Sequence, residues 1–267
     1  MLKVFSYGGG VQSTAALVLA AQGRIDYQTF LFCNVGSDSE NPATLAYYQQ
    51  HALPYAQAHG LVMRELCYTR RDGSQETLFQ RLTRPGARFI GIPVRMANGA
   101  PGRRACTVDF KIKQVDRWLR RAGAVSSGAL VGLGISLDEF TRMRTNTDPD
   151  TCDWKTLDYP LIALRLDRAA CTEIIRWSGL PIPPKSSCWF CPYHSLRVWQ
   201  EMRESQPDLF QRAVALEQLL NNRCMLLGRD RVYFSNKLKP LDQATSEYTQ
   251  LPLLEEDDLC ESGYCFV

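Results

Sequence analysis

The sequence predicts an α/β protein in which helices sandwich a parallel sheet, with a smaller, mostly helical, cysteine-containing region at the C-terminal end. Short apolar runs recur through the first half of the chain, and segments with helical spacing separate them. Strands that alternate with helices form parallel sheets with right-handed crossovers. A proline-rich stretch follows residue 180, so we expect two domains, residues 1–180 and residues 181–267.

The elements are expected in a β-α-β-α-β order at the start of the chain. Apolar runs predict strands at residues 2–7, 29–35, 61–68 and 129–136. Helical spacing predicts helices at residues 12–22, 42–59, 109–121, 167–179, 196–204 and 207–221. Glycine, proline and arginine interrupt residues 70–102, and prolines interrupt the segment "LPIPPKSSCWFCPYHS", so both are expected to be loops.

Composition narrows the class of protein. Hydrophobic residues make up 45% and charged residues 22% of the chain, which is typical of a globular protein. No apolar run approaches the ~18 residues of a membrane span, and glycines rather than a cleavage site follow the first apolar run. We therefore expect a cytoplasmic protein with no membrane partner, whose ten cysteines are thiols, metal ligands or catalysts rather than disulfides.

The segment "SYGGGVQS", residues 6–13, joins the first predicted strand to the first predicted helix. Bare backbone N–H groups followed by a helix N-terminus suit a phosphate. The spacing matches neither common nucleotide fingerprint, because no lysine follows the glycines and Ser13 stands where a dinucleotide loop has glycine. A glycine turn that only lets a strand and a helix pack closely would give the same pattern, so both interpretations stay open.

The same loop resembles the pyrophosphatase loop, commonly Ser-Gly-Gly-X-Asp-Ser, of the ATP-pyrophosphatase and phosphoadenosine-phosphosulfate-reductase superfamily. Gly9, Gly10 and Ser13 match, whereas Gly8 replaces the first serine and Gln12 replaces the aspartate. The resemblance implies an adenine nucleotide alpha-hydrolase-like fold and a loop that holds the pyrophosphate of ATP. It implies nucleotide contacts from Ser6, Gly8, Gly9, Gly10, Gln12 and Ser13, with Ser13 also catalytic.

Further along, "CNVGSDSENPATLAYY" resembles the segment that carries adenine and magnesium contacts in these proteins, which nominates Asn34, Gly36 and Asp38. A carboxylate at a strand end beside a triphosphate is a suitable Mg²⁺ ligand. Asp38 and Glu40 would serve equally well as helix N-cap residues.

Another strand end, in "GISLDEFTRMR", places acidic and basic residues together. Here Asp138 and Arg142 are candidate catalytic residues and Arg144 is a candidate nucleotide contact, because carboxylates hold magnesium and arginines clamp phosphate. An ordinary strand-to-helix corner with i, i+3 or i, i+4 ion pairs would show the same residues.

The cysteines of "SSCWFCPYHS" and "RRACTVDFKI" are candidate metal ligands. Cys188 and Cys191 have the spacing of a pair that binds one metal or cluster, and Cys106 follows two arginines that favour its thiolate. A zinc site completed by His194 or by the tail cysteines Cys260 and Cys265, and a set of buried thiols, are the alternatives. Three further cysteines, Cys33, Cys67 and Cys171, lie in apolar patterns, and we interpret them as core residues.

The cysteine arrangement resembles that of the iron–sulfur members of the superfamily, which implies that Cys106, Cys188 and Cys191 hold a [4Fe–4S] cluster. Adenylylsulfate reductases use four cysteines, the first two adjacent, but here Ala105 precedes Cys106. Three ligands leave one iron open to bind sulfide, which favours sulfur insertion over sulfate reduction.

Most of the chain resembles the small ATP pyrophosphatases of DNA phosphorothioation systems, through "SYGGGVQST", "GISLDEFTRMR", "YPLI" and "PPKSSCWFCPYHS". This implies ATP and Mg²⁺ as cofactors, DNA as the acceptor, a cysteine desulfurase as sulfur donor, and a homodimer as one assembly. Sulfonucleotide reduction, tRNA thiolation and a nucleotide-binding zinc regulator remain as alternatives. The arginine-rich stretch 64–104, with Phe89, Arg103 and Arg104, is either a solvated face or the place where a polyanion lies.

Overall fold

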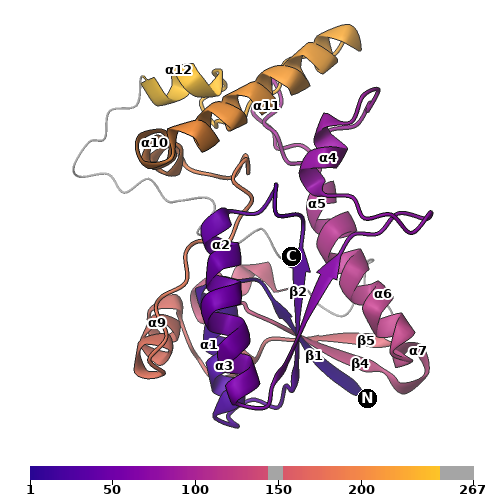
Figure 1. Ribbon diagram of the computed structural model, residues 1–267, viewed down its shortest axis with the longest axis vertical. Coiled ribbons are helices and arrows are strands. Elements are labelled where there is room, and N and C mark those ends of the chain that lie inside the picture. Colours follow the sequence, from indigo (N-terminus) through magenta and orange to yellow (C-terminus); the bar gives the residue numbers. More distant parts are fainter. Residues whose placement is uncertain (144–152, 247–267) are drawn as a thin grey trace.

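The computed structural model describes residues 1–143 and 153–246 and has an α/β architecture built on a parallel sheet (Figure 1). The sheet has five strands in the order β3-β2-β1-β4-β5, and every neighbouring pair is parallel. The strands are β1 (Leu2–Tyr7), β2 (Thr29–Asn34), β3 (Val62–Cys67), β4 (Ala129–Leu133) and β5 (Lys155–Asp158). The four predicted strands are confirmed, whereas β5 was missed because its sequence, KTLD, carries no apolar run.

The helices follow the predicted order with several corrections. Their bounds are α1 (Val11–Ala21), α2 (Pro42–Tyr47), η1 (Tyr48–Ala52), α3 (Leu53–Ala58), α4 (Leu78–Thr83), α5 (Ala105–Thr107), η2 (Val108–Ile112), α6 (Lys113–Arg121), α7 (Ala124–Ser127), η3 (Leu137–Arg142), α8 (Pro160–Ala163), α9 (Arg168–Trp177), α10 (Leu196–Ser205), α11 (Pro207–Leu226) and α12 (Leu241–Ser246).

One loop prediction, two helix bounds and one missed helix need correction. Residues 70–102 are not wholly loop, because α4 begins there with a capping box in which Thr77 and Gln80 bond reciprocally. The helix predicted from residue 109 starts at Ala105. Helix α11 runs five residues beyond the predicted end at 221, and the short α12 was not predicted.

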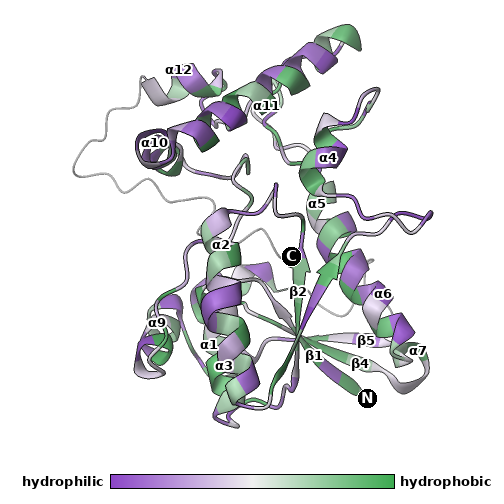
Figure 2. Ribbon diagram, viewed as in Figure 1, coloured by the Kyte–Doolittle hydropathy of each residue, from purple (hydrophilic) through white to green (hydrophobic). Residues whose placement is uncertain are grey.

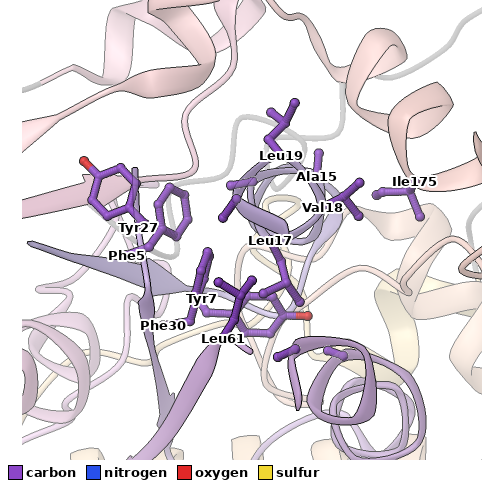
Figure 3. Packing of buried hydrophobic residues seen from close by; sticks show 14 of the residues in the cluster. Phe5, Tyr7, Ala15, Leu17, Val18, Leu19, Tyr27, Phe30, Leu61 and Ile175 are labelled. Atoms are coloured by element: carbon purple, nitrogen blue, oxygen red, sulfur yellow. The ribbon is translucent and has the colours of Figure 1, made fainter. Parts of the chain in front are cut away.

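The two faces of the sheet are buried by different helices, since side chains alternate along each strand. Phe5, Tyr7 and Phe30 point toward α1 and pack with Leu17 and Ile175 in one cluster (Figure 3). A second cluster contains side chains of the opposite alternation together with residues of α6 and α7: Val4, Leu31, Cys33, Val131, Leu119 and Ala124. In Figure 1, α1, α2, α3 and α9 accordingly lie on one side of the sheet and α6 on the other.

Strand β3 forms one edge of the sheet. It carries Arg64 and Glu65 in its middle, and Figure 2 shows this hydrophilic stretch in contrast to the hydrophobic β2. An edge strand faces solvent along one side, so it tolerates charged side chains there. The edge at β3 is thus polar.

The C-terminal region packs on residues 78–110 rather than on the sheet alone. Trp199 of α10 and Phe210 of α11 belong to one buried cluster with Leu78 of α4, Phe110 of η2 and Trp189. No helix within residues 1–143 and 153–246 is both long and apolar enough to cross a membrane.

Candidate functional site

The order of the strands defines one crevice. From β1 the chain moves to β2 and β3 on one side and later to β4 and β5 on the other, so the order reverses between β1 and β4. Ligands of open α/β sheets bind outside the carboxyl ends of the strands at such a switch point. Ser6, half-buried near the end of β1, is paired with Leu133, the last residue of β4. The glycine loop directly follows β1 and therefore borders this crevice.

The glycine loop, residues 8–10, leads into α1; Gly8 and Gly9 are buried and Gly10 is partly exposed. Gly10 is the N-cap of α1 and no side chain caps the helix; the Ser13 hydroxyl instead donates to the Gly10 carbonyl at 3.0 Å. The first N–H groups of a helix have no partner within the helix, and they carry its positive dipole end. The loop can therefore accept an anion, as the glycine pattern predicts.

Glycine is required at position 9 for two reasons. Its φ is +79°, a conformation that L side chains rarely adopt, and a Cβ there would lie 2.9 Å from Cγ2 of the buried Thr44. At Gly10 the space is wider, because a Cβ would meet only Cβ of Ser186, at 3.7 Å. Gly9 fixes the shape of the loop, whereas the absence of a side chain at Gly10 leaves its backbone open.

Three residues that the sequence did not nominate hold the loop in place. A Cβ on Gly134, just after β4, would lie 3.1 Å from the Ser13 nitrogen, so glycine allows the two segments to approach closely. Gln12 donates from Nε2 to the Ser136 hydroxyl at 3.4 Å, and the Ser186 hydroxyl donates to the Gly8 carbonyl. Gly134, inside the strand predicted at residues 129–136, was the one local signal, since a glycine within a strand often marks a close backbone approach.

The residues nominated after β2 form a tight turn. Asn34 accepts from the Gly36 N–H at 2.8 Å and donates to Glu65 at 2.8 Å. The Asp38 carboxylate accepts from the hydroxyls of Ser39 at 2.8 Å and Thr77 at 2.9 Å. These bonds position Asp38 without excluding further ligands, because a carboxylate has about four acceptor sites.

The N-cap of the helix that follows this turn is Asn41, which accepts from the Ala43 N–H at 2.9 Å. The N-cap interpretation of Asp38 and Glu40 was therefore wrong. Asp38 instead connects this turn to residues 180–195, which we call the cysteine loop. The Trp189 indole of that loop donates to the Asp38 backbone carbonyl at 2.8 Å.

The acidic and basic residues after β4 occupy η3. Glu139 and Arg142 form a buried ion pair at 2.8 Å, with both side chains 5% exposed. Burial raises the pKa of Glu139, and the Arg142 guanidinium opposes that shift. Asp138 accepts from the N–H of Arg168 at 3.0 Å, at the start of α9. Arg144, the third nominated residue here, lies outside the described residues.

The nominated cysteines lie on two segments, distant in the sequence, that border the same apolar cluster. Cys106 and Cys188 both pack against the apolar cluster of Trp189 and Phe190. Cys191 donates its N–H to the Cys188 carbonyl at 3.1 Å. Burial raises the pKa of the neighbouring Tyr193, and the Arg104 and Arg95 guanidinium groups oppose that shift. All three thiols are half-buried.

The segment that contains Cys191 lies near two positively charged side chains. Arg95 and Arg104 each lie over the Tyr193 ring, with guanidinium carbons 5.6 Å from its centroid, and Tyr193 is two residues after Cys191. Among residues 1–143 and 153–246, however, no three His, Cys, Asp or Glu side chains are grouped closely enough to hold a metal ion. His194 bonds through Nε2 to the Ser187 hydroxyl at 2.9 Å, and Cys260 and Cys265 lie outside the described residues.

The thiols interpreted as core residues differ from one another. Cys33 and Cys171 are buried, and burial raises the pKa of each to about 12. Cys67, the last residue of β3, is only half-buried, so the prediction that it lies in the core was wrong. A strand end at the sheet edge is less covered than a strand centre.

The fold and this loop define a class: an open parallel α/β sheet with a glycine loop and an uncapped helix N-terminus at its switch point. Comparison with known proteins adds no relative, since no family model, no curated protein and no solved structure matches the chain.

Proposed function

We propose that the chain is an ATP pyrophosphatase of the adenine nucleotide alpha-hydrolase-like fold, which adenylates a substrate for sulfur insertion. The single observation that supports this most is the glycine loop, residues 8–10, which opens into the uncapped N-terminus of α1 at the switch point between β1 and β4. Bare N–H groups at such a position suit the β- and γ-phosphates of a nucleotide.

The proposed first step is attack on ATP by a phosphate oxygen of the acceptor. A bond forms between that oxygen and the α-phosphorus, the α–β anhydride bond breaks, and pyrophosphate leaves. Charge accumulates on the leaving pyrophosphate, where the N–H groups at the start of α1 stabilise it without reorganisation. In the second step sulfide attacks the activated phosphorus of the acceptor, and AMP leaves with the oxygen.

The neighbouring side chains have positioning roles in this proposal. Asp38 and Asp138 are the carboxylates offered to Mg²⁺, which would neutralise the triphosphate when bound. Gln12, in place of the usual aspartate, is held by Ser136 and orients the loop toward the end of β4. Arg142 is neutralised by Glu139, so we assign it to fixing η3 beside the crevice.

Cys106, Cys188 and Cys191 are not grouped closely enough here to hold a single metal ion. They remain the thiols offered to a [4Fe–4S] cluster, which would supply a site for sulfide when bound. Arg95 and Arg104, which lie over the Tyr193 ring near Cys191, support this assignment because cations in this region favour an anionic ligand set. DNA, activated at a non-bridging phosphate oxygen, is the proposed acceptor, and a cysteine desulfurase is the proposed sulfur donor.

Pyrophosphate and AMP release from ATP, with and without DNA or tRNA, tests the enzyme assignment. The informative variant is Gly10→Ala, since its methyl would make only an ordinary contact with Ser186 and should leave the fold intact. We expect a loss of pyrophosphate release of at least about tenfold, because the methyl stands on the backbone that a phosphate approaches. Gly91→Ala is the matched control, since its methyl would meet only Cε1 of Phe89, at 3.8 Å. Equal activity of Gly10→Ala and Gly91→Ala would remove the loop from the mechanism.

Anaerobic purification with iron, sulfide and zinc analysis tests the cysteine assignment. Absorbance near ~400 nm with iron that is lost in Cys106→Ala and in Cys188→Ala is the expected result. Full iron retention in either variant would remove that residue from the set of ligands, and stoichiometric zinc without pyrophosphate release would favour the nucleotide-binding regulator. Sulfite production with a thiol reductant would favour sulfonucleotide reduction.

A further inference from the structure

A basic groove lies at the carboxyl end of the edge strand β3. The loop that follows β3 and one side of α6 enclose an open cavity of about 620 Å³, and an adjoining cavity of about 220 Å³ shares Arg117 and Arg121 with it. We call these two cavities the basic groove. Its cationic lining consists of Arg70, Arg71, Lys113, Arg117 and Arg121.

The carboxylates around the basic groove are already bonded. Asp109, the one carboxylate in the wall of the larger cavity, pairs with Lys113 at 2.7 Å and with Arg81 at 3.1 Å. The buried Glu76 pairs with Arg70, and also with Arg81 at 3.0 Å and Arg84 at 3.5 Å. Part of the arginine-rich stretch predicted to face a polyanion is thus neutralised within the protein.

The remaining carboxylates near the groove also have partners. Glu65, in the wall of the smaller cavity, accepts from Asn34, and Asp72 accepts from the hydroxyl and the N–H of Ser74. These hydrogen bonds come from neutral groups, so Glu65 and Asp72 keep their negative charge and offset part of the positive charge of the groove.

Three guanidinium groups in the groove form no ion pair with any carboxylate among the described residues. Arg117 donates to the Thr69 carbonyl at 3.2 Å and to Gln114 at 3.1 Å, so neutral acceptors orient it without cancelling its charge. Within residues 1–143 and 153–246, the side chains of Arg71 and Arg121 form no ion pair or hydrogen bond, and both residues are exposed. Uncompensated arginines in a concave site are suited to bidentate contact with phosphate.

The cations on α6 form a row. Lys113, Arg117 and Arg121 are four residues apart, which places them on one side of the helix with about 6 Å of rise between successive members. The row is about 12 Å long and spans the rise of about three nucleotides of one strand of a duplex.

The position of the groove connects it to the crevice. The sheet is parallel, so the loop after β3 and the glycine loop after β1 both lie at the carboxyl ends of the strands. Only β2 separates β3 from β1 in the sheet. Two strand spacings correspond to about 10 Å. Helix α6 leads into α7 and the start of β4, so its row runs from Lys113, near the carboxyl end of the sheet, away from that end to Arg121. Because α6 and α1 cover opposite faces of the sheet, a polyanion held in the groove reaches the glycine loop only past Lys113 and over the end of β2.

We propose that the basic groove binds the backbone phosphates of a nucleic acid, with Arg71, Arg117 and Arg121 as its principal contacts. The inference rests on the proposed function in that it gives the nucleic-acid acceptor its binding surface. The concave shape favours a strand over an anionic membrane, because a flat lipid surface contacts a protruding patch rather than the floor of a cavity.

Binding of a fluorescent DNA duplex of about 20 base pairs, measured by anisotropy without ATP over a series of salt concentrations, tests the groove. We compare the full chain with Arg71→Glu and Arg121→Glu, whose side chains are exposed and unbonded, so folding should be unaffected. Each variant is expected to weaken binding on the order of tenfold at about 50 mM salt and to lower the slope of log K against log salt by about 1. Arg24→Glu, an exposed arginine beyond the opposite end of α1, is the matched control and should bind as the unmodified chain does.

Binding that is equal in all three variants would overturn the proposal. Groove-dependent binding of inorganic phosphate without binding of DNA would also overturn it, in favour of a small-anion site. Loss of pelleting with phosphatidylserine vesicles in place of loss of DNA binding would assign the groove to a membrane. Pyrophosphate release from ATP is measured in the same variants, so that failure of the groove and failure of the pyrophosphatase assignment give different results.

Discussion

The replacement of Gly9 by alanine tests whether the glycine loop has the shape that the structure assigns to it. An alanine at φ +79° has a left-handed backbone conformation, which costs roughly 1–2 kcal/mol. Its methyl would also lie 2.9 Å from Cγ2 of Thr44, whose side chain is fully buried and has little room to move. Overpacking of this kind costs about 1–3 kcal/mol.

The two contributions can be separated with a control glycine. Gly23 also has a positive φ, +69°, but a Cβ there would have no heavy atom within 4 Å. Gly23→Ala therefore reports the backbone strain alone, and Gly9→Ala should be less stable than Gly23→Ala by about 1–3 kcal/mol. For a 267-residue chain the unfolding entropy is about 0.6 kcal/mol/K, so the two variants should differ in Tm by roughly 2–5 °C.

A second substitution identifies the contact. Thr44→Ser removes Cγ2 and retains the hydroxyl, so the Gly9→Ala/Thr44→Ser pair should recover most of the difference from Gly23→Ala. Urea unfolding followed by tryptophan fluorescence measures each free energy of unfolding. If Gly9→Ala is as stable as Gly23→Ala, or if Thr44→Ser restores nothing, the proximity of the loop to α2 is wrong.

Three further predictions concern buried ionisable groups. Burial raises the pKa of Glu217 to about 7, although the N–H groups of Phe234 and Leu241 donate to its carboxylate and oppose the shift. Because the folded pKa exceeds the unfolded value, stability should fall by about 3 kcal/mol as pH rises from about 4.5 through about 7, and Glu217→Gln should lack this loss in urea titrations. Burial raises the pKa values of Cys33 and Cys171 to about 12, so both thiols should resist iodoacetamide at about pH 8 in the native protein and react once it is unfolded. Mass spectrometry locates the label, and rapid labelling of either thiol in the native protein would contradict its burial. Arg142→Met should destabilise the protein by about 3–5 kcal/mol, because it leaves the Glu139 carboxylate buried without its partner. The double variant Glu139→Gln/Arg142→Met should recover part of the lost stability, and a double variant no more stable than Arg142→Met would refute the pairing.

Residues 2–22 illustrate what local signals predict well. The apolar run of β1, the glycines and the helical spacing of α1 are all read within one segment, and the structure places the strand and the helix there. The cysteine loop was likewise predicted as irregular from its prolines. The role of Ser13 and of the other loop residues in binding a nucleotide stays a prediction.

The sequence by itself determined the alternation of strands and helices and the loop after β1, because apolar periodicity, glycine and proline act over a few neighbouring residues. Only the tertiary structure decided that Thr44, Gly134 and Ser186 lie against this loop. It also decided that Glu76 pairs with three arginines, while Arg71, Arg117 and Arg121 form no ion pair among the described residues. These contacts join residues far apart in the chain, and pairing between such residues depends on how strands order and helices pack. Edge strand β5 escaped prediction for the same reason, since its place beside β4 comes from backbone pairing rather than from an apolar pattern of its own.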